Sequence, residues 1–412
     1  RGDRVFVAPG NAGTAIAAMG LGALALGGCG SSDTDDGDGG SGVDHTSVET
    51  GNTNWITFGR TQDRTHYLEA PDRLNPPLKQ LWSFSDRVLI EFPPAIYDGV
   101  AYLADKYGNV RAIQLKDRKI LWDIQKDKRN VGPPSDTTAP FYYKGRVYVA
   151  FMGGNLVALD AKTGEVVWKR DLQSHLESSP VISGGTLYIG SDKAELHAID
   201  PADGKEKWTF DAHRPIKSSP SVSGGRVFFG NYSGIMYSLD AKTGKVDWRT
   251  NTTVVAPGGD GGFYSSPAIA FGNVYAGRDD GTVYAFDQKT GKVSWSFRTS
   301  GDVYGSPAVG QVKGTPPTVY IGSYDSNLYA LNAKTGKQEW KYRVGGPVPG
   351  TATVIGHTVY TSNFKTAESI GIDVLTHKKT FSFPSPGYTP MVSDGRNLYL
   401  VGYFSFHGFE PK

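Results

Sequence analysis

The sequence predicts an all-β fold, an eight-bladed β-propeller of four-stranded antiparallel blades, and three observations support this prediction. A phrase of about 40–47 residues recurs along most of the chain, as in propeller blades. Each copy holds four short segments of alternating apolar residues, separated by Gly-rich turns. The 412 residues include 53 Gly, 22 Tyr and 19 Phe, a composition that favours tight turns and half-buried strands.

One copy, SSPVISGGTLYIGSDKAELHAIDPADGKEKW at 178–208, shows the four strands of a blade. The segments PVIS, TLYIGS, ELHAID and KEKWTF form the first to fourth strands, which we call A to D. Gly184 and Gly185 turn strand A into strand B. Pro201–Gly204 turns C into D, and the glycine supplies a positive φ angle. The phrase is therefore first of all a structural unit.

The number of blades follows from the first strand of each copy. Seven copies begin with a proline, and the eighth begins without one at Thr351. The last copy, from Met391 to Lys412, ends before any fourth strand. The segment LKQLWSF at 78–84 has the pattern of a fourth strand but nothing before it. We therefore expect the N- and C-terminal strands to meet in one blade and close the ring.

An aromatic residue stands near the start of every fourth strand. Because these side chains recur at one topological position, they cannot all face one ligand. We expect them to be structural wedges that pack between neighbouring blades. They are Trp82, Trp122, Trp168, Trp208, Trp248, Trp295, Trp340 and Phe381.

The phrase D-A-K-T-G-x-x-x-W, together with Ser-Pro before the first strand, resembles the PQQ-type propeller repeat over residues 78–412. Residues 55–77 resemble the lead-in segment that such proteins often carry. The repeat occurs both in quinoprotein dehydrogenases and in BamB-like bacterial lipoproteins, which act as scaffolds. The resemblance therefore implies the fold and leaves the function open.

The enzyme interpretation is the alternative, namely a PQQ-dependent alcohol or sugar dehydrogenase. If the chain resembled the quinoprotein alcohol dehydrogenases in function, the resemblance would imply a quinone held between a Trp and two adjacent disulfide-bonded cysteines. It would also imply a calcium ion bound by a Glu, an Asn and an Asp. This chain has one cysteine, and the repeated tryptophans are assigned to wedging. The eight histidines show no short metal-binding spacing. We expect no catalytic residue, cofactor or metal, and we keep PQQ with calcium only under the alternative.

The single cysteine, Cys29, follows the apolar run 15–26 and the sequence Leu-Gly-Gly, which resembles a bacterial lipobox. The resemblance implies a signal peptide at 1–28, although the first 14 residues fit one poorly, and a lipid on the thiol of Cys29. Residues 29–54 are rich in Gly, Ser and Asp, and they predict a disordered tether. We expect an extracytoplasmic protein, periplasmic or on the cell surface, attached to a membrane only through this lipid.

One rim of the predicted propeller carries the B–C and D–A loops, which vary in length and content and are typical of a binding face. The candidate partner-binding residues precede the A strands or lie in the B–C loops: Glu177, Asp192, Lys217, Tyr232, Tyr264, Arg278, Tyr304, Tyr324 and Tyr388. Tyr and Arg are common interface anchors. The alternative is that these side chains only line or plug the channel mouth. The net charge of +2 gives no sign of nucleic-acid binding. We expect a monomer that binds an envelope protein.

Overall fold

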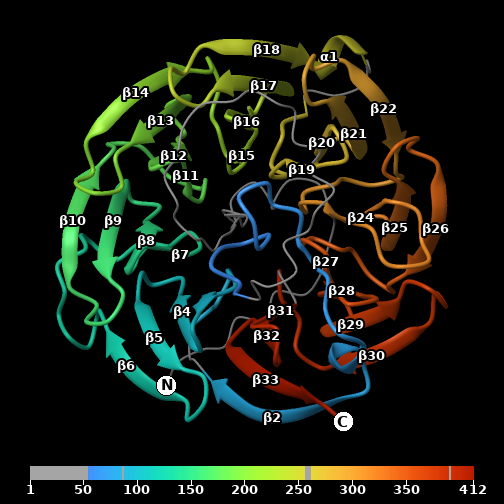
Figure 1. Cartoon of the computed structure of the whole chain (residues 1–412), viewed down its shortest axis with the longest axis horizontal. Helices are drawn as coiled ribbons and strands as arrows, with labels where there is room; N and C mark the ends of the chain where they lie inside the picture. The colour runs from blue at the N-terminus through green and yellow to red at the C-terminus, as the bar shows by residue number, and fades with distance from the viewer. Residues whose placement is uncertain (1–53, 86–87, 256–260, 389–390) are drawn as a thin grey trace, which may run out of the picture.

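The computed structural model describes residues 54–412 except 86–87, 256–260 and 389–390, and these residues form a ring of eight sheets (Figure 1). We call the region enclosed by the innermost strands the channel. This confirms the predicted all-β, eight-bladed propeller. Two short helical turns, η2 (Asp72–Leu74) and α1 (Thr252–Val255), lie between strands. Among the described residues, no helix is long and apolar enough to cross a bilayer.

We number the blades along the chain. Blade 1 contains β3 (Ala95–Tyr97), β4 (Val100–Ala104), β5 (Val110–Gln114) and β6 (Lys119–Asp123), and blade 2 contains β7 (Phe141–Tyr143), β8 (Arg146–Ala150), β9 (Asn155–Asp160) and β10 (Val166–Asp171). Blade 3 contains β11 (Val181–Ser183), β12 (Thr186–Gly190), β13 (Glu195–Ile199) and β14 (Glu206–Asp211), and blade 4 contains β15 (Ser221–Ser223), β16 (Arg226–Gly230), β17 (Ile235–Asp240) and β18 (Val246–Asn251).

Blade 5 contains β19 (Ala268–Ala270), β20 (Asn273–Gly277), β21 (Thr282–Asp287) and β22 (Val293–Arg298), and blade 6 contains β23 (Ala308–Gly310), β24 (Thr318–Gly322), β25 (Asn327–Asn332) and β26 (Gln338–Arg343). Blade 7 contains β27 (Thr353–Ile355), β28 (Thr358–Asn363), β29 (Glu368–Asp373) and β30 (Lys379–Phe383), and blade 8 contains β31 (Met391–Ser393), β32 (Leu398–Gly402), β33 (Ser405–Pro411) and β2 (Leu78–Ser85).

Blade 8 closes the ring as the sequence predicts. The N-terminal strand β2 pairs antiparallel with the C-terminal strand β33, with Trp82 opposite Gly408. The pairing supplies the fourth strand that the last repeat lacks. Both ends of the propeller domain are therefore held by one continuous hydrogen-bonded ladder.

The tryptophans dock on the turn of the following blade. The indole nitrogen of Trp168 donates to the carbonyl oxygen of Pro201 at 3.0 Å, and Trp208 repeats this bond to Ala241 at 3.3 Å. The indole ring lies against the glycine of that turn. A Cβ built on Gly244 would lie 2.8 Å from a ring carbon of Trp208. The glycine of the repeat is thus needed both for its φ of +71° and for ring contact.

The degenerate copy in blade 7 keeps its two contacts with neighbouring blades by other means. In blade 7, His377 replaces the glycine with a φ of +59°, and its ring lies 5.0 Å from the ring of Trp340. Phe381 takes the tryptophan position and packs edge-on against Phe409 of blade 8. Sequence divergence at these positions has therefore kept the packing between blades.

The Ser-Ser-Pro phrase forms a second set of contacts between blades, at the inner strands. The first serine hydroxyl of the phrase, Ser178, accepts from the amide of Gly190 within its own blade, at 3.0 Å. The amide of Ser179 donates to the hydroxyl of Ser219 in the next blade at 2.9 Å. The amide of Ser219 then donates to Ser266, and the series continues through Ser306 to Thr351. This chain of hydrogen bonds links the inner strands of blades 2 to 7.

Residues 55–68 circle the inside of the channel (Figure 1). Their carbonyl oxygens accept hydrogen bonds from the central residue of six inner strands, at 2.6–2.9 Å, and the segment ends in β1 (Tyr67–Leu68), which pairs parallel with β27. The donors are Ile96, Tyr142, Val222, Ile269, Val309 and Val354. Inner-strand edges would otherwise leave buried amides without partners. The lead-in segment is therefore an inner element of the fold.

We predict that Gly244→Ala lowers the free energy of unfolding by about 2–4 kcal/mol. An L-residue in the left-handed region costs about 1–2 kcal/mol, and the new methyl group must displace the ring of Trp208. Gly225→Ala is the matched control, because Gly225 has a φ of +73° but no heavy atom within 4 Å of a built Cβ. Urea unfolding of both variants checks the prediction. Equal losses would show that the ring contact adds nothing.

Candidate partner-binding face

The rim that carries the B–C and D–A loops surrounds the channel mouth with a band of charged and aromatic side chains. Its members come from two repeat positions, three residues before the inner strand's opening proline and the second residue of the B–C loop. Glu177, Lys217, Tyr264 and Tyr304 hold the first position, and Asp192, Tyr232 and Tyr324 hold the second. The repeat thus brings side chains from successive blades together.

Lys217 lies at the centre of a charged cluster between blades 3 and 4. Its ammonium group donates to Glu177 and lies 3.7 Å from an oxygen of Asp192. The imidazole of His175 lies 3.4 Å from Asp192 and 3.6 Å from Glu177. Burial raises the pKa of Glu177, and Lys217 opposes this rise. The hydrogen bond to Asp192 raises the pKa of His175.

The same lysine joins the charged cluster to a row of tyrosines. Its ammonium group lies 5.6 Å from the ring centre of Tyr232 and 5.7 Å from that of Tyr264, within cation–π range. The rings then meet edge to face, Tyr232 with Tyr264 at 5.1 Å, Tyr264 with Tyr304 at 5.6 Å and Tyr304 with Tyr324 at 5.1 Å. These four rings form a continuous aromatic row across blades 4 to 6.

Tyr388 belongs to a second aromatic group, with Phe364 of blade 7 and Tyr403 of blade 8. The ring centre of Phe364 lies 4.8 Å from that of Tyr388 and 4.9 Å from that of Tyr403. Burial raises the pKa of Tyr324 to about 12 and raises those of Tyr304 and Tyr388 as well. The phenol groups of Tyr304, Tyr324 and Tyr388 therefore stay protonated and can donate hydrogen bonds at neutral pH.

Sequence reasoning missed a second charged cluster in blade 1. Lys106 lies 3.4 Å from an oxygen of Glu91 and 3.1 Å from one of Asp136. Burial raises the pKa of Glu91 to about 7, although Lys106 opposes the rise. Glu91 stands three residues before Pro94, as Glu177 stands before Pro180. The repeat position could have identified it, but this copy lacks the Ser-Ser-Pro phrase.

The structure corrects the prediction that Arg278 belongs to the partner-binding face. The prediction placed its side chain on the binding face, but Arg278 is fully buried. Its guanidinium donates to the carbonyl of Gly261 at 2.9 Å and lies 3.4 Å from Asp280. The loop position equivalent to Asp192 is the next residue, Asp279, whose pKa burial raises to about 6. The error is one residue in the register of the B–C loop.

The other predicted residues lie on this face with different exposure. Tyr232 is exposed, Glu177 is buried beneath Lys217, and the remaining side chains are half-buried. The predicted lipidation site, Cys29, lies outside the described residues. The wedge residues lie away from the mouth, on the outermost strands.

A metal ion has one candidate position in the described part of the chain, where ligand atoms of His175, Glu177 and Asp192 lie within 4.8 Å of one another. The ammonium group of Lys217 already contacts both carboxylates. Lys217 therefore offsets one of the two carboxylate charges that would attract a cation, and the hydrogen bond to Asp192 favours the charged form of His175. The arrangement fits a buried ion-pair network better than a metal site.

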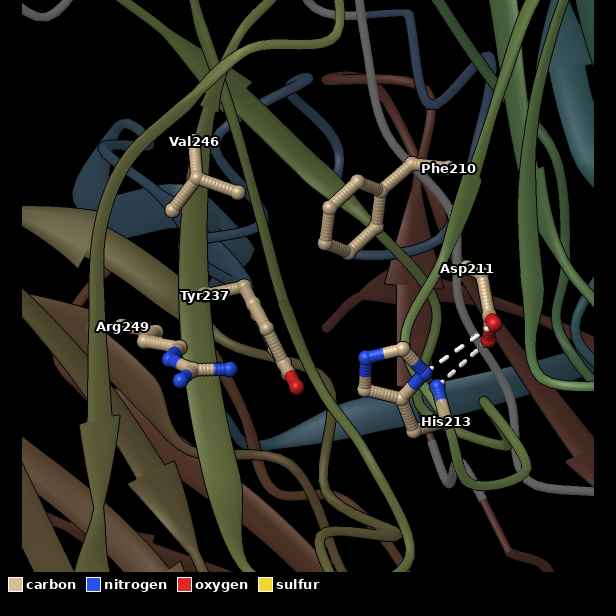
Figure 2. A pocket seen from close by; sticks show the side chains of 6 residues that line it. All are labelled: Phe210, Asp211, His213, Tyr237, Val246 and Arg249. Atoms are coloured by element: carbon tan, nitrogen blue, oxygen red, sulfur yellow. Dashed lines mark hydrogen bonds and ion pairs between the residues drawn. The ribbon is translucent and has the colours of Figure 1, made fainter.

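A small pocket of about 270 Å³ opens on the side of the ring, between the outer strands of blades 3 and 4 (Figure 2). Phe210, Asp211 and His213 line one side, and His213 bonds to Asp211 at 3.0 Å. Tyr237, Val246 and Arg249 line the other side. The volume lies below the range of about 300–1,000 Å³ that is typical of small-molecule sites. None of the predicted residues lines it.

The comparisons with known proteins point to two kinds of relative. The family described as outer membrane protein assembly factor BamB matches residues 78–178, 157–316 and 258–403. Quinohemoprotein alcohol dehydrogenase ADH-IIG of Pseudomonas putida is 31% identical over 142 residues, which cover 32% of this chain and 20% of that protein. BamB of Salmonella typhimurium is 34% identical over 90 residues, which cover 20% of this chain and 23% of that protein.

The matched segments span about a fifth of the length of these two curated relatives. Among solved structures, BamB of Moraxella catarrhalis superposes with a TM-score of 0.66 at 18% identity, covering 81% of this chain and 99% of that chain. At this identity the likeness establishes the fold. The repeat family, the ring of eight blades and the charged and aromatic mouth are the features from which a function must be argued.

We predict that Glu91→Gln raises the free energy of unfolding above that of the unchanged protein, and that this difference grows as the pH rises. With a folded-state pKa of about 7 against about 4.5 when unfolded, Glu91 binds its proton more tightly in the folded protein. Ionisation above pH 5 therefore costs stability, by up to about 3 kcal/mol at pH 8–9, and the amide avoids this cost. Lys106 keeps its partner Asp136 in the variant.

The measurement is urea unfolding of both proteins between pH 4 and pH 9. The difference in unfolding free energy should be small at pH 4 and grow through pH 7. Glu165→Gln, at an exposed carboxylate on the opposite rim, is the control. A difference that does not change with pH would contradict the assignment of a raised pKa to Glu91.

Proposed function

The chain belongs to the family of PQQ-like propellers described as outer membrane protein assembly factor BamB, and from this premise we propose that it is a protein-binding scaffold of the cell envelope. We propose further that it is extracytoplasmic, that Cys29 carries a lipid anchor, and that the B–C and D–A rim binds the partner. The observation that carries the proposal is the mouth itself. Its carboxylates are paired with Lys106 and Lys217, and a row of tyrosine rings extends from Lys217.

Such a surface suits a protein partner. Tyrosine side chains offer large contact areas with little loss of conformational freedom on binding, and their hydroxyl groups donate hydrogen bonds. The ion pairs at Lys106 and Lys217 hold the neighbouring side chains in place before any partner arrives. A rigid propeller with variable loops on one rim can therefore present a preformed interface.

The alternative is a PQQ-dependent oxidoreductase, and the quinone dehydrogenases among the relatives favour it. The residues of this chain do not fit the group. Residues 55–68 occupy the inside of the channel, Trp55 is fully buried against β3, and the other seven tryptophans lie on outermost strands. One cysteine cannot form a vicinal disulfide. The carboxylates that could hold calcium already hold Lys217.

The proposal is tested by photo-crosslinking in the native envelope. A photo-reactive amino acid at position 304, on the mouth, should give a protein adduct. The same amino acid at position 289, on the exposed turn of the opposite rim, is the matched control and should give none. Adducts confined to position 289 would contradict the choice of face.

Alanine substitution then measures how much the aromatic row contributes to binding of the partner. We expect Tyr264→Ala with Tyr304→Ala to reduce the adduct formed from position 324 by about 30-fold, because loss of an aromatic anchor costs about 2 kcal/mol or more. Lys289→Ala should leave the yield unchanged. An undiminished yield in the double variant would remove the tyrosines from the interface.

A separate assay decides between scaffold and enzyme. Purified protein is incubated with PQQ and calcium, and quinone binding and dye reduction with alcohols and sugars are followed. We expect no tight quinone binding and no turnover. Turnover would overturn the scaffold proposal in favour of the oxidoreductase.

The anchor has its own test in fractionated cells. We expect Cys29→Ala to move the protein from the membrane fraction to the soluble extracytoplasmic fraction, because the thiol is the proposed attachment point of the lipid. Unchanged membrane association would contradict the lipid anchor and leave the partner-binding proposal untouched.

A further inference from the structure

Every outermost strand of the propeller has a β-bulge at the residue before the wedge aromatic. In β10 the pairing register shifts between Val166 and Trp168, so that Val167 has no partner on β9. The same shift occurs on the outermost strand of each of the other seven blades. A bulge bends the strand and re-aims the side chain of the extra residue. Eight equivalent side chains are therefore displayed at the outer wall.

The side chains at these eight positions differ in polarity. Five consecutive blades, 3 to 7, carry polar residues there: Lys207, Asp247, Ser294, Glu339 and Thr380. The remaining three, blades 8, 1 and 2, carry Leu81, Leu121 and Val167, which are 41%, 43% and 42% exposed. The blades lie side by side, with β2, β6 and β10 along one side of the ring (Figure 1). The wall of these three blades is thus an exposed apolar stripe.

A neighbouring position enlarges the stripe. Ile120 lies next to Leu121 on β6 and is 41% exposed. Exposed apolar side chains that gather on neighbouring blades favour an interaction site over scattered surface residues.

Cations border the stripe at both ends of β6. Lys119 lies at its start, and Lys126 and Lys128 lie in the loop that follows it. All three are exposed, and none of them takes part in an ion pair within the described part of the chain. A partner that covers the apolar side chains would therefore meet positive charge on both sides. Charge complementarity favours an acidic segment.

The shape of the wall favours a protein over a lipid surface. The three outermost strands belong to consecutive blades of an eight-blade ring, so the wall is convex and turns through about a quarter of the circle (Figure 1). A flat bilayer cannot contact all three strands at once. An extended protein segment can follow the curve and contact all three strands.

We infer that the outer wall formed by β2, β6 and β10 is a second protein-binding surface, and that its occupant is an acidic, extended segment of a partner protein that places apolar side chains over Leu81, Leu121 and Val167. This inference goes beyond the proposed function, because the wall lies apart from the channel mouth. The propeller would then hold two partners at once, one at the mouth and one on the wall.

The test places a photo-reactive amino acid at position 81, 121 or 167 of the full-length chain in native cells. Positions 207, 294 and 380, the same bulge sites of polar blades, are the controls. We expect one protein adduct of the same mass from the three apolar positions and at least tenfold less from the controls. Peptide sequencing of the adduct should identify an acidic segment with apolar residues.

Variants separate this surface from the mouth. Leu121→Ser should lower the adduct from positions 81 and 167 at least tenfold, whereas Ser294→Ala and the mouth variant Tyr304→Ala should leave it unchanged. Since Leu121 is exposed, thermal unfolding of Leu121→Ser should match that of the unchanged protein. A variant that fails to fold is replaced by Leu81→Ser, read from position 167.

Five outcomes would overturn the inference, four of them in the crosslinking itself. These are no adduct at the three positions, equal yields at the control positions, adducts with lipid, or an adduct with a second copy of this chain. A crosslinked segment that is basic or wholly polar would also overturn it. Loss of crosslinking at position 304 alone would count against the mouth proposal and leave the wall intact.

Discussion

The structure depends on satisfying the inner edges of the blades. Each inner strand presents a backbone edge to the channel, away from bulk water, and a buried amide without a partner is costly. Carbonyl groups of residues 55–68 accept from the central residue of six of these strands. One continuous segment therefore completes the hydrogen bonding of six blades. The segment lies inside the ring, and both proposed binding surfaces lie elsewhere, at the mouth and on the outer wall.

Two repeated contacts hold the blades to one another around this segment. At the outer wall, an indole rests on the glycine of the next turn and donates to its backbone. At the inner wall, a serine amide donates to the serine of the next blade. Both contacts are local and recur with the repeat. The phrase that dominates the sequence is therefore architecture, and chemistry must be sought at positions where copies differ.

The sequence alone predicted the number of blades, the closure of the ring by β2 and β33, and the face that carries Glu177, Lys217 and the tyrosines. These follow from periodicity, which is local information. It did not predict the path of residues 55–68, because this segment does not repeat and its partners lie in six different blades. It also missed Glu91, whose copy lacks the usual phrase, and it placed Arg278 one residue out of register.

The fold described here requires residues 55–68 to lie inside the ring and to bond to its inner strands. Amide hydrogen exchange of the full-length protein tests this requirement most directly. The amides of Ile96, Val222 and Val354 donate to carbonyl groups of residues 55–68, and these amides should be protected as strongly as the middle strands of the blades. Exchange there should then require opening of the propeller. If these three amides exchange within seconds while the middle strands stay protected, residues 55–68 do not bond to the inner strands, and the proposed role of this segment is wrong.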